Sequence, residues 1–313
     1  MNYKYFIFIL MYIGTMFGQQ ERYVAFTFDD LPYATSIKDI KTHSRIIEHI
    51  SATLARNNVP ATGFIIGSKI NNSDKIDPDY IPILKTWLNA GLDLGNHSFS
   101  HMSLNTTPIK EYENDFLRCD SLIRPFITGN GYKLKYYRHP YLQTGRDTSI
   151  KNDFERFIGT KGYKIAPITI DNSDWIFAAA YEKAFLANDS LMMKKVADTF
   201  ISYLESYFLY YESQSDKIFG RNIKHTLLLH ANLLHADNLQ LVINMLKKLN
   251  YKFITIDEAL TDSAYTHFDT FNKAGGISWI HRWAYSEGKR GIFFKGEPNT
   301  PEFIMKYAGV ESE

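Results

Sequence analysis

From residue 22 onward, short apolar runs alternate with longer segments in which apolar residues recur at helical spacing. Ile46, Ile50 and Leu54, for example, would share one face of a helix. The runs that predict strands are 22–28, 61–66, 91–96, 134–138, 163–170, 225–230 and 251–255. The segments that predict helices are 38–57, 78–90, 108–124, 148–161 and 237–249. This alternation indicates an α/β fold with parallel strands, and roughly seven strands favour a (β/α) barrel.

Two segments depart from this alternation. Residues 176–222 are rich in aromatic residues and predict helices, while residues 263–313 contain a pair of glycines and two tryptophans. No repeat or low-complexity linker separates either segment from the rest of the chain. We therefore expect one barrel domain, residues 21–262, with a helical insertion at 176–222 and a C-terminal extension, 263–313, packed on the barrel.

The N-terminus has the layout of a secretory signal peptide. Lys4 precedes a mostly apolar run, residues 5–17, that is too short to span a bilayer as a helix. Gly18 offers a small residue for cleavage, and no cysteine nearby could carry a lipid. We expect residues 1–20 to be removed and the mature protein to be periplasmic or extracellular, without a stable membrane anchor. The alternative is an N-terminal core strand.

The amino-acid composition bears on which classes of function are possible for this protein. The 313 residues are 45% apolar and carry a formal net charge of +1. Such a balance gives no indication of nucleic-acid binding, which normally requires a basic surface. The single cysteine, Cys119, excludes an internal disulfide and a cysteine-based metal site.

Two adjacent carboxylates, Asp29 and Asp30, follow the first predicted strand. Within a strand, neighbouring side chains point to opposite faces. At the end of a strand, however, both can turn toward one mouth, where like charges need a cation or a proton between them. A solvated turn is the alternative interpretation.

Two histidines follow another predicted strand, 91–96, in the pattern His97-x3-His101. Ser98 or Ser100 could begin a helix there, and histidines four apart on a helix face the same way and can bind one metal ion. With one aspartate they would make the open three-ligand site that catalytic zinc uses. Two ordinary polar histidines are the alternative.

Three further polar clusters end predicted strands: Arg138, the stretch 171–175, and His230. Each has an ordinary explanation when taken alone, as a surface charge, a turn or helix cap, or a core histidine. In a (β/α) barrel, however, the C-terminal ends of the strands meet at one mouth. Five such clusters together therefore favour an active site.

The clusters resemble, in order, the five sequence motifs of the polysaccharide deacetylases with a NodB-type domain, the fourth carbohydrate esterase family. The matching stretches are residues 27–30, 97–101, 138–141, 171–175 and 228–230. The resemblance covers about residues 22–260, and it implies a distorted (β/α) barrel. The segment between Trp175 and His230 and the chain after Asp262 depart from the family pattern.

The resemblance implies a metal site and a base. Asp30, His97 and His101 would bind one divalent ion, while Asp29 would be the general base and Arg138 would orient it by ion pairing. Zn²⁺ is the first choice for the ion, but two histidines and an aspartate also accept Co²⁺, Mn²⁺ or Ni²⁺.

The resemblance also implies an acid and a substrate pocket. His230 would be the general acid, tuned by Asp174. Trp175 and Leu228 would line the acetyl pocket, and the backbone N–H of Tyr141 would stabilise the oxyanion.

The function implied is metal-dependent hydrolysis of N-acetyl groups on a glycan such as peptidoglycan, a chitin-like oligomer or an exopolysaccharide. An acetylated glycan is then the expected partner, with no nucleic acid. The alternatives are an esterase for O-acetyl groups of xylan-type sugars, a cyclic amide hydrolase on the same scaffold, and a non-catalytic glycan-binding module.

Four other residues have weaker signals. His235 and Asp237 are interpreted as the start of the helix after His230, with substrate contact as the alternative. Trp279 and Trp283 are interpreted as packing residues of the extension, with stacking on sugar rings as the alternative.

Overall fold

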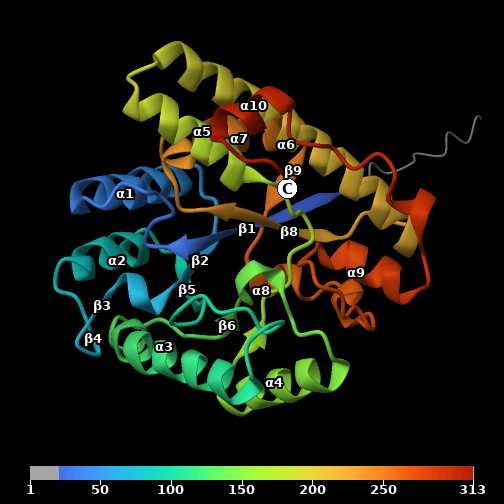
Figure 1. Cartoon of the computed structure of the whole chain (residues 1–313), viewed down its shortest axis with the longest axis horizontal. Coiled ribbons are helices and arrows are strands. Elements are labelled where there is room, and N and C mark those ends of the chain that lie inside the picture. Colours follow the sequence, from blue (N-terminus) through green and yellow to red (C-terminus); the bar gives the residue numbers. More distant parts are fainter. Residues whose placement is uncertain (1–20, 313) are drawn as a thin grey trace, which may run out of the picture.

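The structure, a computed structural model, describes residues 21–312. Its centre is one parallel sheet of seven strands (Figure 1). In spatial order the strands are β7 (Lys164–Ile165), β6 (Tyr136–Tyr137), β5 (Asp93–Asn96), β2 (Ala61–Ile65), β1 (Arg22–Leu31) and β8 (Lys224–His230), with β9 (Tyr251–Phe253) beside the start of β1. The parallel pairing agrees with the prediction from the alternating sequence pattern.

Hydrogen bonds beyond β7 curl the sheet toward a barrel. The Ile170 N–H donates to the Thr226 carbonyl at 2.9 Å, and the Leu228 N–H donates to the Ile170 carbonyl at 3.1 Å. These bonds join the segment after β7 to β8, which lies at the other edge of the sheet. The predicted distorted (β/α) barrel is confirmed, and a short bridge rather than a full strand completes it.

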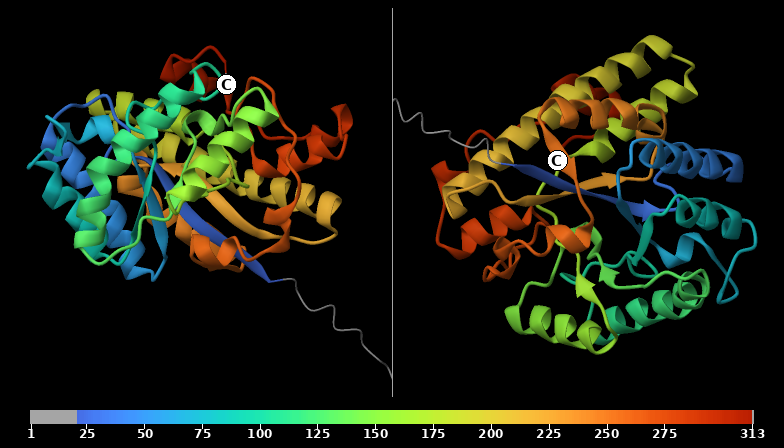
Figure 2. Two further views of the ribbon diagram at one scale, coloured as in Figure 1. Left: turned by 90° about the horizontal axis from the view of Figure 1, so that it is seen from below. Right: turned by 180° about the vertical axis from the view of Figure 1, so that it is seen from behind.

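Helices cover the outside of the sheet, as Figure 2 shows from two further directions. They are α1 (Ile40–Arg56), α2 (Tyr80–Asn89), α3 (Ile109–Gly129), α4 (Thr148–Thr160) and α7 (Leu233–Lys248). Helix α1 begins after Asp39, whose carboxylate accepts the Thr42 N–H at 2.9 Å, as a helix N-cap does. Its buried face contains Ile46, Ile50 and Leu54, as their spacing predicted.

Some strands are shorter than their apolar runs. Strands β6 and β7 have two residues each, although the patterns extend over 134–138 and 163–170. A small antiparallel hairpin, β3 (Asn71–Asn72) and β4 (Lys75–Ile76), lies outside the main sheet and was not predicted. Apolar residues continue past the hydrogen-bonded part of a strand because the connecting segments are also buried.

The aromatic-rich region forms two helices, α5 (Asp174–Leu186) and α6 (Ser190–Phe219), which pack on each other and on α7. The chain then ends in α8 (Ile256–Ala259), α9 (Trp279–Ser286) and α10 (Glu302–Ala308), of which α9 contacts α6 and α10 contacts α5. Trp279 and Trp283 are 6% and 1% exposed, in agreement with their interpretation as packing residues.

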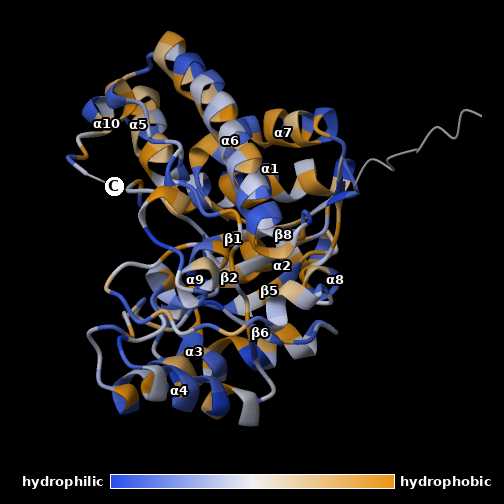
Figure 3. Cartoon of the chain, turned by 90° about the vertical axis from the view of Figure 1, so that its right-hand side faces the viewer, coloured by the Kyte–Doolittle hydropathy of each residue, from blue (hydrophilic) through white to orange (hydrophobic). Residues whose placement is uncertain are grey.

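Apolar residues concentrate where the helices face the sheet (Figure 3). In β1, Val24, Ala25, Phe26 and Phe28 are all buried, because helices and neighbouring segments cover both faces of the strand. None of the helices in residues 21–312 is long and apolar enough to cross a membrane. The predicted signal peptide, residues 1–20, lies outside the described residues.

Candidate active site

A cleft of about 1140 Å³ opens at the C-terminal ends of β1 and β8. Eight predicted site residues line it: Asp29, Asp30, His97, His101, Tyr141, Trp175, Leu228 and His230. Arg138 and Asp174 are fully buried beside it. Helices α5 and α6 and the C-terminal extension supply much of the remaining wall, which includes Tyr207, Tyr211 and Glu297.

A bulge at the end of β1 brings the two adjacent carboxylates to one mouth. Strand β1 pairs with β2 up to Phe28 and again at Leu31, and the register shifts between them. Asp30 lies in the bulge with φ 67°, in the left-handed region that residues with side chains rarely adopt. In a regular strand, Asp29 and Asp30 would point to opposite faces.

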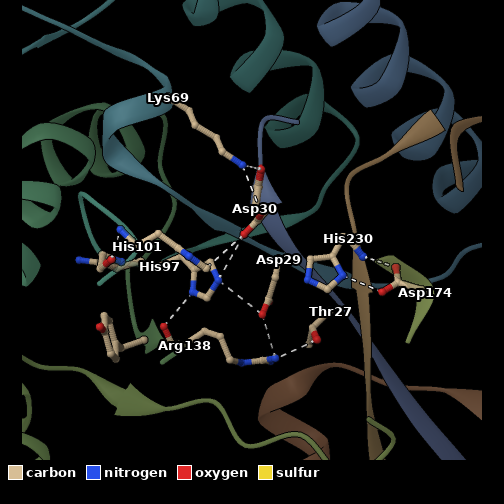
Figure 4. A network of polar contacts seen from close by, with 12 residues as sticks. Thr27, Asp29, Asp30, Lys69, His97, His101, Arg138, Asp174 and His230 are labelled. Carbon is tan, nitrogen blue, oxygen red and sulfur yellow. Dashed lines mark hydrogen bonds and ion pairs between the residues drawn. The ribbon is translucent and has the colours of Figure 1, made fainter. Parts of the chain in front are cut away.

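Asp30, His97 and His101 form a cluster with the geometry of a metal site (Figure 4). Asp30 Oδ1 lies 3.6 Å from His97 Nε2 and 3.5 Å from His101 Nε2, and the three potential ligand atoms are within 4.8 Å of one another. His97 Nδ1 donates to the Arg138 carbonyl at 2.9 Å, which leaves Nε2 to bind an ion.

The charge states of these side chains suit a cation. Burial lowers the pKa of His97 and of His101 to about 4, so both rings are neutral near pH 7. Burial alone would raise the pKa of Asp30, but the Lys69 ammonium and the nearby histidines outweigh it and lower the pKa to about 2. Two neutral imidazoles and one carboxylate are therefore ready to bind a divalent ion without losing protons.

The histidines converge through a turn, and the helix predicted to start at Ser98 or Ser100 is wrong. Residues 97–108 contain no helix, and Ser98 and His101 both have left-handed backbones, with φ 67° and 55°. The His101 N–H donates to Ser98 Oγ at 2.9 Å. The Asp115 carboxylate of α3 accepts the N–H groups of Phe99 and Ser100. This distant carboxylate stabilises a turn that local sequence does not indicate.

Asp29 lies beside this cluster and is almost fully buried. Its Oδ2 is 3.5 Å from Arg138 Nη1 and 3.6 Å from His97 Nε2, while its Oδ1 has no hydrogen-bond partner among the described residues. Burial raises the pKa of Asp29 to about 6, although the Arg138 charge opposes this. A carboxylate with a free oxygen and such a pKa can accept a proton near neutral pH.

Arg138 is held firmly in place. Its side chain is fully buried, its Nη2 donates to Thr27 Oγ1 at 3.1 Å, and its guanidinium lies 4.6 Å from the centre of the Phe64 ring. It pairs with Asp29 and does not reach the cleft. Its expected role in orienting Asp29 stays a prediction.

His230 lies at the end of β8, across the cleft from the histidine cluster. Its Nδ1 donates to Asp174 Oδ1 at 2.7 Å, and its backbone N–H donates to Asp174 Oδ2 at 2.8 Å. Burial would lower the pKa of His230, but the Asp174 carboxylate outweighs it and raises the pKa to about 9. His230 is therefore a protonated imidazolium facing the cleft at neutral pH.

His235 is a part of this arrangement that the sequence did not indicate. It lies in the first turn of α7, as interpreted, and its N–H donates to Asn232 Oδ1. Its side chain is fully buried, however, and Nε2 donates to Asp174 Oδ2 at 2.8 Å. Asp174 thus accepts from two histidines, and these interactions lower its pKa despite its burial. No spacing rule links His235 to a residue 61 positions earlier.

Three residues offer surfaces to a ligand. Trp175 is 46% exposed and Tyr141 is 58% exposed, whereas Leu228 is buried, and all three line the cleft. The Tyr141 ring lies 4.4 Å from the His101 ring. An apolar residue and two aromatic rings beside a cationic acid suit an acylated polar ligand.

Lys69 also contributes to the site, although no sequence pattern indicated it, and Asp171 lies there without a role predicted from sequence. Lys69 Nζ donates to the Asp30 carbonyl and to Asp30 Oδ2, both at 3.2 Å. Asp171 lines the cleft, and its pKa is raised to about 7, first by burial and then by Glu297. The pairing of Lys69 with Asp30 depends on the bulge in β1 and could not be predicted from its position in the chain.

The sequence matches proteins of known family. Residues 18–155 match the sequence model of the polysaccharide deacetylase family. A peptidoglycan-N-acetylglucosamine deacetylase of Bacillus cereus is 28% identical over 152 residues, 49% of this chain and 46% of that protein. The peptidoglycan-N-acetylglucosamine deacetylase PgdA of Listeria monocytogenes is 23% identical over 236 residues, 75% of this chain and 38% of that protein. The chain spans less than half the length of these curated relatives.

Solved structures share the fold. A CE4 family pseudoenzyme from Bacillus anthracis matches with a TM-score of 0.52 at 16% identity, over 77% of this chain and 66% of that one. A mutant of it with restored enzymatic activity also has a TM-score of 0.52, at 17% identity, over 77% of this chain and 68% of that one. At these identities the likeness concerns the arrangement of strands and helices.

Proposed function

We propose that this protein, whose residues 18–155 match the sequence model of the polysaccharide deacetylase family, is a metal-dependent hydrolase that removes N-acetyl groups from an N-acetylated glycan. One observation carries the proposal. A carboxylate with a raised pKa, Asp29, lies in one cleft with a neutral His2Asp cluster and a protonated histidine, His230. The curated relatives, named as peptidoglycan deacetylases, make peptidoglycan the first glycan to test.

The metal site of the proposal consists of Asp30, His97 and His101. These residues would hold a divalent ion, Zn²⁺ or alternatively Co²⁺, Mn²⁺ or Ni²⁺, which would supply Lewis-acid chemistry towards the acetyl carbonyl and water. Both imidazoles are neutral and the carboxylate is ionised. The three side chains can therefore bind this ion without first losing a proton. Lys69 keeps one oxygen of Asp30 occupied, so the other faces the histidines.

Proton transfers belong to Asp29 and His230. Asp29 removes a proton from water as that water attacks the carbonyl carbon, and Arg138 keeps the carboxylate oriented. His230 then donates its proton to the amide nitrogen, so that a neutral amine leaves and acetate remains. Each group of this kind contributes a rate factor of about 10²–10⁴.

The remaining residues bind and orient the acetyl group. Leu228 and Trp175, which line the cleft, would contact its methyl group. The backbone N–H of Tyr141 donates to the oxyanion that develops on the carbonyl oxygen. Asp174 accepts the Nδ1–H of His230, which leaves the Nε2–H as the proton that His230 donates.

Acetate release from a panel of substrates tests this function. The panel contains peptidoglycan, chitin oligomers, an N-acetylated exopolysaccharide and acetylated xylan, each with and without a chelator. A cyclic amide, whose hydrolysis releases no acetate, is assayed separately for opening of its ring. We expect acetate from N-acetylated glycans, loss of activity with chelator, and recovery on adding Zn²⁺. Acetate from xylan alone would indicate an O-acetyl esterase. Glycan binding without any hydrolysis, in metal-loaded protein, would indicate a binding module.

Export is a separate part of the proposal. Residues 1–20 would act as a signal peptide that is removed, and the mature barrel would reach the periplasm or the exterior. N-terminal sequencing of secreted protein should begin near Gln19. Protein that retains Met1 and stays in the cytosol would contradict it.

A further inference from the structure

The loop after β6 keeps Tyr141 in a conformation that its own sequence does not favour. Tyr141 has φ 57° and the next residue, Leu142, has φ 53°. Both carry a Cβ, and such residues keep left-handed backbones only where the surrounding structure holds them. Pro140, with its restricted φ, precedes them. Something outside the loop must therefore stabilise it.

The C-terminal extension crosses this loop at Gly276. A Cβ placed at residue 276 would lie 1.7 Å from the Tyr141 carbonyl oxygen and 3.0 Å from Leu142 Cβ. Real Cβ atoms do not approach backbone so closely, so the extension touches the loop backbone here and only glycine fits. The neighbouring Gly275 is exposed, and a Cβ there would meet nothing within 4 Å.

Hydrogen bonds fix the extension just before this contact. The Ala274 carbonyl accepts from Asn105 Nδ2 at 2.8 Å and from Gln143 Nε2 at 3.1 Å. Asn105 Oδ1 in turn accepts the Gly145 N–H at 2.9 Å. The loop is thus tied to the extension on the same side as Gly276.

Further bonds fix the extension just after the contact. Ser278 Oγ donates to the Thr169 carbonyl at 2.8 Å, and the Trp279 N–H donates to the Ile168 carbonyl at 2.7 Å. These partners lie in the segment that leads to the bridge with β8. Gly276 is therefore anchored to the barrel wall as well as to the loop.

Arg282 completes the arrangement. This buried side chain donates to Thr144 Oγ1 at 2.5 Å and pairs with Asp269, which also pairs with Lys151 of α4. We infer that residues 274–282, here named the C-terminal strap, position the backbone of Tyr141 for catalysis. Gly276, which approaches the Tyr141 carbonyl, is the positioning residue. The inference rests on the proposed function, in which the Tyr141 N–H stabilises the oxyanion.

The chemical consequence is specific. A donor to the oxyanion acts mainly in the transition state, when negative charge develops on the carbonyl oxygen. Moving the Tyr141 backbone should therefore lower kcat and leave KM and metal content nearly unchanged. A strap that only stabilised the fold would affect the amount of folded enzyme and would not change the constants of the folded fraction.

The first experiment compares Gly276→Ala with the matched control Gly275→Ala. The first substitution displaces the Tyr141 carbonyl, and we expect kcat on the N-acetylated glycan to fall roughly 10²-fold. The second should leave kcat unchanged, because its methyl group has open space. Equal kcat in Gly276→Ala and wild type, at equal metal content, would overturn the inference.

A second measurement needs no substrate. Hydrogen exchange of peptides that contain residues 139–145 should be faster in Gly276→Ala than in wild type, and unchanged in Gly275→Ala. If Gly276→Ala does not fold, Asn105→Ala takes its place, since it removes a bond to Ala274 and should show both effects more weakly. If hydrogen exchange in the loop is the same in these variants as in wild type, the C-terminal strap does not position the loop. If the wild-type enzyme releases no acetate, the proposed function is wrong. The hydrogen-exchange measurement would still test whether the C-terminal strap positions the loop.

Discussion

The histidines on the two sides of Asp29 carry different charges. On one side, burial lowers the pKa of His97 and His101 to about 4, so they are neutral. On the other, His230 is also largely buried, yet its pKa is raised to about 9. The three rings are of the same chemical type and line the same cleft. Neighbouring carboxylates must account for the difference.

The carboxylates differ in exposure and in partners. Asp30 is 23% exposed, pairs with Lys69, and lies 3.5 Å or more from the histidines. Asp174 is fully buried and accepts hydrogen bonds at 2.7 Å from His230 and 2.8 Å from His235. Burial makes a histidine neutral by default, and a buried carboxylate that accepts a hydrogen bond from the ring reverses this. His97 has a buried carboxylate, Asp29, only at 3.6 Å, beyond hydrogen-bond distance. His97 and His101 are therefore suited to bind a cation, and His230 is suited to donate a proton.

The largest effect is expected on the neutral side. His101→Ala removes one of three proposed ligands, so the protein should lose its metal and its activity should fall to background. Metal content by atomic spectroscopy and acetate release measure this. His49→Ala, at an exposed position of α1, is the control and should change neither. Full metal occupancy in His101→Ala would refute the assignment.

Asp29 and Asp30 can be separated by the same kind of substitution. Asp29→Asn should retain the metal and lose turnover by roughly 10²–10⁴-fold, because an amide cannot accept the proton. Asp30→Asn should weaken metal binding, because a neutral amide is a poorer ligand for a divalent ion. Metal content and turnover, measured side by side, decide between the roles. Loss of metal in Asp29→Asn with retention in Asp30→Asn would reverse them.

A smaller effect should appear on the charged side as a change in pH dependence. His230 must be protonated to act as an acid, so wild-type activity should fall as pH rises through about 9. Asp174→Asn removes the charge that raises this pKa, so the alkaline limb should move to lower pH. For each pH unit by which the alkaline limb moves down, activity at a pH above that limb should fall about tenfold. An unmoved limb in the pH–rate profile would show that another group controls it.

The smallest effect is expected at His235. His235→Ala leaves Asp174 with His230 as its remaining ring partner, which should change the alkaline limb and kcat less than tenfold. His235→Gln keeps an N–H donor near Asp174 and should restore most of the activity. Equal behaviour of the two variants would mean that the hydrogen bond to Asp174 is not the reason for the effect.

The predictions from sequence succeeded where local patterns carry the information. Helix α1 lies within its predicted range because Ile46, Ile50 and Leu54 alternate with polar residues at helical spacing. The parallel sheet followed from the alternation of strands and helices. The metal-type cluster contains the three residues that the motifs singled out. Their catalytic roles stay predictions.

The predictions failed where a long-range contact determines the backbone. The helix expected after Asn96 is a turn stabilised by Asp115, and the hydrogen bond between His235 and Asp174 joins segments 61 residues apart. Likewise, the extension was expected to pack on the barrel, but nothing in its sequence indicated that Gly276 contacts Tyr141.

The sequence by itself determined the order of the elements and the types of side chain at the strand ends. Hydrophobic periodicity selects a helix or a strand locally, and the barrel then brings the strand ends together. Tertiary structure alone decided how those side chains are aimed and charged. Asp30, Ser98, His101 and Tyr141 all have positive φ, which local preferences disfavour and distant contacts stabilise. The tertiary structure also decided the charges of the histidine side chains, because the pKa of a histidine depends on its burial and on which carboxylate the fold places beside it.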